Sequence, residues 1–111
     1  MTDMLEDLHK QLHAAGVIEP IWHRRNHAGY VLLSYTSHLV ALYTSGNYEA
    51  MPIFVGRVQE FLGTAPAQQL SNTYLEIVRR YVVAVCAFLM RRSDVSEAAK
   101  QFLPAHLRHA N

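Results

Sequence analysis

The chain has 111 residues, of which half are hydrophobic and 17% are charged, and its formal net charge is +1. This length fits one domain, and the near-zero charge argues against a general nucleic-acid binder, which sets many Lys and Arg side chains against phosphates. The charged share is below the roughly 25% of an ordinary globular domain, which favours association with another polypeptide.

The first predicted helix runs from about Asp3 to Ala15. Asp3 and Glu6 have the spacing of a capping box, and Gly16 is the expected stop. Its larger apolar residues fall on one stripe, typical of a helix that packs on one side only. They are Met4, Leu5, Leu8 and Leu12.

Pro20 suits the first turn of a second, long helix, which we predict to end at Thr44. Its apolar side covers about half of the circumference, more than one neighbouring helix usually covers. The opposite side is low in charge and carries aromatic and imidazole rings, which suit a protein interface. We predict that it binds a partner through His23, His27, Tyr30, Ser34 and His38. An ordinary solvated polar face is the alternative.

A third helix is predicted from Pro52 to Leu62, because proline is favoured in a first turn. The residues from Tyr48 to Met51 are predicted to form a separate turn before it. Together with Phe54, Tyr48 and Met51 are predicted to extend the partner-binding surface.

A fourth helix is predicted to begin between Pro66 and Thr73 and to end near Arg92. It contains an unbroken apolar segment, Tyr81 to Met90, which is about half the length needed to cross a bilayer. A helix that is apolar on every side must be covered on every side. The covering must therefore come from protein.

Three apolar residues of this segment fall among charged residues on the helical wheel: Val83, Ala87 and Met90. Exposing such a ridge to water would waste about 1.5–3 kcal/mol for each side chain the size of Val or Met. We predict that it is the seam of a homodimer, because twofold homodimers are the commonest oligomers. The alternative is that a fifth helix folds over it.

Ser93 is the expected start of that short fifth helix, with Asp94 and Glu97 at capping-box spacing and Pro104 as its end. Residues 105–111 are expected to be a frayed tail. Since no segment alternates like a strand, the sequence predicts an all-α, compact bundle of four to five helices. The second and fourth helices are its two long central ones, and the chain is a single domain.

Cys86 is the only cysteine and lies in the apolar segment, where we expect a buried, unreactive thiol. The first residues are acidic and lack the basic and apolar regions of a signal peptide. We therefore expect a cytoplasmic protein.

Pairs of histidines three or four residues apart could place two imidazoles on one helix face, as a zinc site requires. The pairs are His9 and His13, His23 and His27, and His106 and His109. No cysteine accompanies them and no third ligand has a suitable spacing, so we predict no metal and no cofactor.

Two other functions stay open. A histidine-phosphotransfer domain would use His27, although this residue is followed by Ala28 rather than by the lysine usual in such domains. A small nucleic-acid-associated protein would use Arg24, Arg25, Arg79 and Arg80. No Ser or Cys has a recognisable base beside it, so we predict that the chain is not an enzyme.

In size, helical pattern and lack of a catalytic motif, the chain resembles small bacterial quorum-sensing anti-activators of the QslA type. The resemblance covers the whole chain, especially His23 to Thr44 and Tyr74 to Arg92. It implies a dimer that grips the ligand-binding domain of a LuxR-type regulator and blocks its dimerisation and DNA binding. We therefore expect an anti-activator that regulates transcription through protein–protein interaction.

Overall fold

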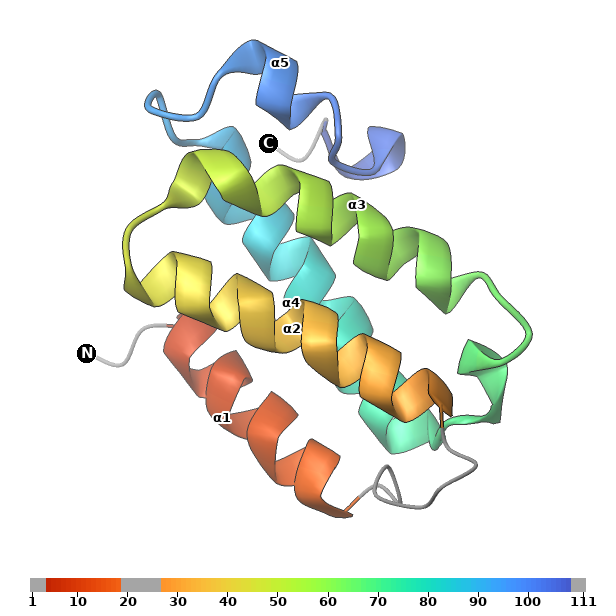
Figure 1. Ribbon diagram of the computed structural model, residues 1–111. Helices are drawn as coiled ribbons and strands as arrows, with labels where there is room; N and C mark the ends of the chain where they lie inside the picture. The colour runs from red at the N-terminus through yellow and green to blue at the C-terminus, as the bar shows by residue number, and fades with distance from the viewer. Residues whose placement is uncertain (1–3, 19–26, 109–111) are drawn as a thin grey trace.

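The computed structural model describes residues 4–18 and 27–108, which fold into α-helices and short 3-10 turns (Figure 1). No strand occurs in this part of the chain, so the predicted all-α bundle is confirmed. None of its helices combines the length and the apolar character that crossing a membrane would take. The helices are α1 (Met4–Ile18), α2 (His27–Thr44), α3 (Met51–Leu62), α4 (Asn72–Met90) and α5 (Glu97–Lys100). The 3-10 turns are η1 (Tyr48–Ala50), η2 (Ala67–Gln69) and η3 (Ala105–Leu107).

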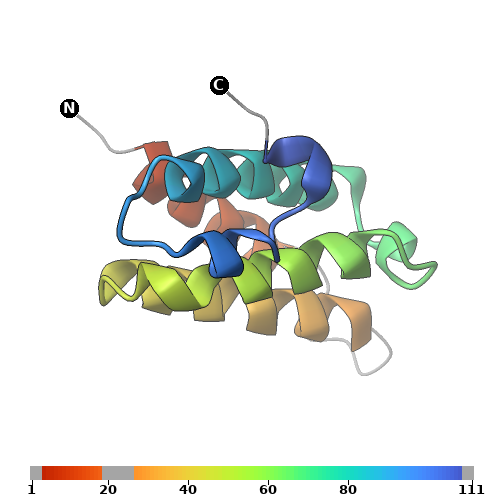
Figure 2. The same ribbon diagram turned by 90° about the horizontal axis from the view of Figure 1, so that it is seen from above.

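The four longer helices form two layers (Figure 2). One layer contains α2 and α3, and the other contains α1 and α4. Contacts between α3 and α4, and between α1 and α2, join the layers into a four-helix bundle. The short α5 packs against α3, and η3 packs against α4. The two outer faces of the bundle therefore belong to different helix pairs.

The core lies between the layers, and α4 contributes most of its large side chains. Burial of each is worth about 1.5–3 kcal/mol. From α4 the fully buried large residues are Tyr74, Leu75, Val78, Tyr81, Val85 and Leu89, and from α2 and α3 they are Leu32, Leu39, Met51, Val55 and Val58.

The apolar segment of α4 is mostly covered by the chain itself. Cys86 and the residues on its side of the helix are buried, and Met90 packs against the core as a partly buried side chain. Val83 remains 50% exposed. The short α5 packs against α3 and leaves Val83 half exposed. The length of the apolar segment alone therefore does not require a second subunit. The apolar surface of α4 that stays exposed lies around Val83.

The ends of α1 and α2 differ in part from the sequence prediction. The predicted stop at Gly16 is wrong, since α1 continues to Ile18. Glycine inside a helix costs about 1 kcal/mol but does not by itself end it. The predicted start at Pro20 lies outside the described residues. At its other end α2 stops as predicted, because Gly46 has a φ of 76° and the Asn47 N–H donates to the Leu42 carbonyl at 2.9 Å.

The first turn of α4 is capped by Ser71, whose hydroxyl oxygen accepts a hydrogen bond from the Tyr74 N–H at 3.3 Å. Ser96 does the same for α5 through the Ala99 N–H at 3.1 Å. Such side-chain acceptors satisfy N–H groups that have no partner within the helix.

The predicted capping box at Asp94 is therefore wrong. The Asp94 carboxylate instead accepts two hydrogen bonds from the Arg92 guanidinium, at 2.9 and 2.8 Å. The planar fork of arginine matches a carboxylate, and this pairing removes Asp94 from the helix start. The Arg92 guanidinium lowers the pKa of Asp94 below its usual value.

The C-terminal segment is more ordered than the frayed tail that the sequence predicts, at least as far as residue 108. Leu103 is buried, and Leu107 packs against the core from η3. The segment crosses α3 at Gly56, where an added Cβ would lie 2.5 Å from the Phe102 carbonyl oxygen. Only a residue without a side chain allows two backbones to approach this closely. Residues 109–111 lie outside the described part.

Candidate functional site

The outer surface of the α2–α3 layer contains most of the predicted partner-binding residues. Tyr30, Ser34 and His38 are all exposed and follow one another at four-residue intervals on α2. The His38 ring stacks on the half-buried Phe54 of α3, with 5.2 Å between ring centroids and an interplanar angle of 13°. The His38 Nδ1–H donates to the Ser34 carbonyl at 3.1 Å, which fixes the ring's orientation.

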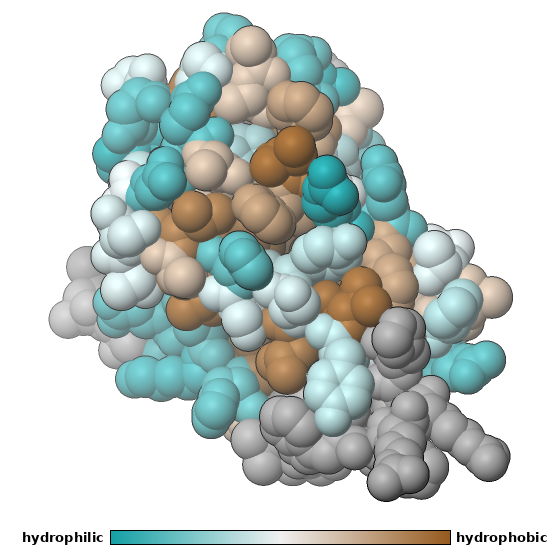
Figure 3. All heavy atoms as spheres, viewed as in Figure 1, coloured by the Kyte–Doolittle hydropathy of each residue, from teal (hydrophilic) through white to brown (hydrophobic). Residues whose placement is uncertain are grey.

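Ile53 adds an apolar side chain to this surface and is 38% exposed. We define the α2–α3 face as Tyr30, Ser34, His38, Ile53 and Phe54. Figure 3 views the same layer and shows apolar residues spread over it, separated by weakly polar ones. Sequence reasoning missed Ile53, although its place opposite the core stripe of the third helix could have indicated it.

Met51 does not belong to this surface, and its prediction as a partner contact is wrong. It is fully buried, as are Val55 and Val58. The reason is that α3 begins at Met51 rather than after it. Met51 therefore lies four residues before Val55 and seven before Val58, on the side of α3 that faces the core.

Tyr48 was predicted to extend the partner-binding surface, but its ring packs against other aromatic rings of the fold. Its half-buried ring lies at 5.1 Å from the Phe88 ring and at 6.0 Å from the Tyr43 ring. The Arg92 guanidinium lies over it, 4.7 Å from the ring centroid, in cation–π geometry. Tyr48 therefore joins η1 to α2 and α4. Of the remaining predicted contacts, His23 lies outside the described residues, and nothing is described of the side chain of His27.

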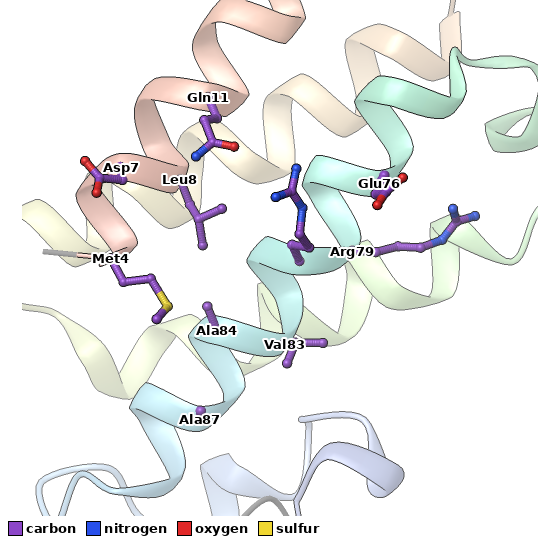
Figure 4. Close-up of a pocket in the computed structure, with 10 residues that line it drawn as sticks. Met4, Asp7, Leu8, Gln11, Glu76, Arg79, Val83, Ala84 and Ala87 are labelled. Carbon is purple, nitrogen blue, oxygen red and sulfur yellow. The ribbon is translucent and has the colours of Figure 1, made fainter.

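A groove with a volume of about 700 Å³ runs between α1 and α4 on the other layer (Figure 4). Its floor and walls are apolar, and they consist of Met4, Leu8, Val83, Ala84 and Ala87. Its polar rim consists of Asp7, Gln11, Glu76, Arg79 and Arg80. We call it the α1–α4 groove. Met4 and Leu8 point from α1 toward α4 in Figure 4, and Met4 is 68% exposed.

Val83 also borders a second hollow on the opposite flank of α4. This hollow has a volume of about 350 Å³ and lies against the C-terminal part of α3 and η3. We call it the α4–η3 hollow, and Leu62, Arg79, Val82 and Leu107 are among its lining residues. The exposed Val83 side chain is thus a ridge between two depressions. Of the predicted seam, Val83 and Ala87 border the groove, whereas Met90 packs against the core.

No family model, curated protein or solved structure matches this chain.

The histidine pairs do not assemble into a metal site in the described part of the chain. There, no three His, Cys, Asp or Glu side chains come close enough together to hold an ion. The His9 Nε2 lies 3.0 Å from the Tyr81 hydroxyl, within hydrogen-bond distance, while His13 is exposed. His106 is exposed on η3, and His23 and His109 lie outside the described residues.

Burial disfavours the charged forms of two titratable groups of α4. Burial, together with the nearby Tyr43, raises the pKa of Tyr81 far above its usual value. Burial raises the pKa of the Cys86 thiol to about 12. A thiol is nucleophilic only as the thiolate, so Cys86 has the environment of a structural residue rather than of a catalytic one.

Proposed function

We propose that this protein is an anti-activator that binds a transcription regulator through the α2–α3 face and blocks the regulator's dimerisation and DNA binding. The regulator we propose is of the LuxR type that controls quorum sensing. The protein would act in the cytoplasm, where its partner binds DNA, and without a cofactor or a catalytic step.

The observation that carries the proposal is the absence of charge along α2. The helix runs from His27 to Thr44 and contains no Asp, Glu, Lys or Arg, yet its outer side is exposed. A solvated helix usually carries charged residues on its outer side. The central parts of protein interfaces are depleted of charge and enriched in aromatic residues.

The composition of the α2–α3 face supports the same function. Tyr30 and Phe54 provide large rings with few rotatable bonds, so ordering them on binding costs little entropy. Ser34 lies between Tyr30 and His38 on the same stripe and is small, which lets a partner approach the helix closely. A regulator whose own dimerisation surface covers this face could no longer pair with a second regulator.

A gel-shift experiment with a matched variant tests the proposal. Wild-type protein, used as bait in extract from its own bacterium, should retain a DNA-binding regulator. The purified regulator should then lose its DNA complex when the protein is added in equimolar amount. The variant Ser34→Arg, which places a long charged side chain at an exposed position, should weaken both effects by about tenfold or more, equal to about 1.4 kcal/mol. Gln69→Glu, exposed on η2, is the control.

Three outcomes would overturn the proposal. In the first, the wild-type and Ser34→Arg baits retain the same proteins. In the second, the retained regulator binds DNA equally well with and without the protein. In the third, the Gln69→Glu control weakens the interaction as much as Ser34→Arg does.

A further inference from the structure

The α4–η3 hollow is bordered by polar and apolar side chains from each of the three elements that enclose it. The polar groups are an amide, a guanidinium and an imidazole, and each of them carries an N–H donor. Among the described residues, no Asp or Glu borders the hollow. The pairs are Gln59 and Leu62 from α3, Arg79 and Val82 from α4, and His106 and Leu107 from η3. Donors without carboxylates beside them favour an anion.

Helix spacing places the guanidinium and an apolar wall on the same side of α4. Arg79 and Val83 are four residues apart, so they are neighbours along one face of the helix. In Figure 4 both extend from α4 on the side away from α1. Leu62 and Val82 also line the hollow and are buried, so they form its floor. A charged group therefore lies at the edge of an apolar depression.

The short turn η3 borders the hollow on its third side and is itself held by hydrogen bonds. The Leu107 N–H donates to the Pro104 carbonyl at 2.9 Å, and the Arg108 guanidinium donates to the side-chain carbonyl of Gln101. The Leu107 side chain packs against the core. These contacts give the backbone of His106 a defined place beside the hollow, so little ordering of the chain is needed for binding there.

The fold itself makes no use of the three donors. In the described ranges, no hydrogen bond or ion pair involves the side chain of Gln59, Arg79 or His106. Arg79 and His106 are exposed and Gln59 is half-buried, so water can satisfy all three in the free protein. A ligand with acceptor oxygens can replace this water without breaking a contact of the fold.

We infer that the α4–η3 hollow binds a small carboxylic acid with a compact apolar body. The carboxylate accepts hydrogen bonds from the Arg79 guanidinium, and the Gln59 amide and the His106 ring N–H stand beside it as further donors. The apolar body lies against Val83 and Leu107. Such a ligand covers Val83, whose side chain is 50% exposed in the free protein.

The charge and the size of the hollow both favour a monocarboxylate. Arg79 is the only Lys or Arg among the described residues that border it, and a guanidinium fork matches a single carboxylate. A phosphate monoester carries about −1.5 to −2 charges, more than one guanidinium neutralises. The volume of about 350 Å³ lies near the lower end of the range for small-molecule sites, about 300–1,000 Å³.

The larger α1–α4 groove is a poorer site for an anion. Asp7 and Glu76 border it together with Arg79 and Arg80, so its rim has no net charge. Carboxylates that face a bound anion are unfavourable. The lack of such groups distinguishes the α4–η3 hollow from its neighbour across Val83.

NMR titration of the full chain with benzoate tests the inference. Benzoate should cause saturable shifts of the Gln59 side-chain amide, the His106 ring and the N–H groups around Arg79. Benzamide has the same ring without the charge, and benzylamine has the opposite charge. Phenyl phosphate has the same ring with a larger negative charge. All three should bind at least about tenfold more weakly than benzoate, equal to about 1.4 kcal/mol.

Two matched variants test the assigned guanidinium. Arg79→Gln should weaken benzoate binding by about tenfold or more. Arg80→Gln makes the same change one residue further along α4, where the side chain borders the groove but not the hollow, and it should keep the wild-type affinity. Both arginines are exposed, so both variants should keep the circular dichroism spectrum of the wild type.

Four results overturn the inference. They are the absence of saturable shifts with benzoate, equal binding of benzamide, tighter binding of phenyl phosphate, and equal weakening by Arg79→Gln and Arg80→Gln. The hollow does not include the α2–α3 face, so Ser34→Arg should bind benzoate as the wild type does. The inference and the proposed anti-activator function therefore fail separately.

Discussion

Replacement of Gly56 by alanine tests how the C-terminal segment packs on α3. For an isolated helix, glycine to alanine in the interior is stabilising by about 0.5–1 kcal/mol. In this fold the new Cβ would lie 2.5 Å from the Phe102 carbonyl oxygen, which belongs to the backbone and cannot rotate away. The segment must therefore retreat, and such overpacking costs about 1–3 kcal/mol.

Gly63→Ala is the matched control, because it makes the same chemical change at the end of the same helix. Gly63 has a φ of −82°, which alanine adopts without strain, and the nearest atom to a new Cβ is the Glu60 carbonyl oxygen at 3.4 Å. This variant should be as stable as the wild type or more stable, by up to about 1 kcal/mol. Both variants restrict the unfolded chain similarly. The difference between their free energies of unfolding therefore measures the clash of the new Cβ with the Phe102 carbonyl oxygen.

Urea unfolding followed by circular dichroism measures that difference. Gly56→Ala should unfold with a free energy about 1–3 kcal/mol lower than that of Gly63→Ala, with the same denaturant slope. Removing the Phe102 side chain in addition should not restore stability, because the contact is with the backbone carbonyl. A Gly56→Ala protein as stable as Gly63→Ala would refute the packing of the C-terminal segment across α3.

Three further predictions concern buried or tethered groups. The Cys86 thiol should resist Ellman's reagent in the native protein and react after unfolding, because burial raises its pKa to about 12; rapid native reaction would contradict its burial. Tyr81→Phe should lower the free energy of unfolding by about 1 kcal/mol and shift the His9 imidazole NMR signals, since it removes the hydroxyl 3.0 Å away; unmoved His9 signals would exclude that contact. Glu49 accepts hydrogen bonds from the Ser96 hydroxyl and N–H at 2.6 and 2.7 Å, and these lower its pKa below the usual 4.5. Its stabilising effect should therefore be full above pH 4.5 and disappear as the pH falls through the folded pKa. Glu49→Gln should be less stable than the wild type at neutral pH and equally stable in acid. The same difference in free energy of unfolding at both pH values would contradict this prediction.

Helix periodicity and local stop signals made most of the fold predictable. The third helix and the turn before it lie close to the predicted bounds. Pro52 favours a helix start and Gly63 a helix end, and both effects are local in the sequence. The end of α2 was predictable for the same reason, since Gly46 adopts the left-handed conformation that ends a helix.

Contacts between distant segments were not predictable from local pattern. Asp94 had suitable capping spacing, but the nearby Arg92 competes for its carboxylate and Ser96 caps α5 instead. Ser96 is in turn bound by Glu49, forty-seven residues away in the chain. No local spacing rule relates such partners.

For the candidate surfaces, too, features within one helix were predictable, and features formed between helices were not. The stripe of Tyr30, Ser34 and His38 followed from the helical wheel, because the three residues lie on one helix. The α1–α4 groove did not, since it exists only where α1 meets α4. Val83 was singled out on the wheel as misplaced among charges, but its position between two depressions depends on α1 and η3.

The pairing of α1 with α4 has a consequence for synthesis on the ribosome. The helix α1 emerges before α4, against which it mainly packs, and α4 is translated only after α2 and α3. Until then Leu5, Leu8 and Leu12, all buried in the finished protein, have no lasting cover. Apolar surface left open in a nascent chain is prone to aggregation and attracts chaperones. Slower translation between α3 and α4 should therefore lower the soluble yield more than slower translation after α4.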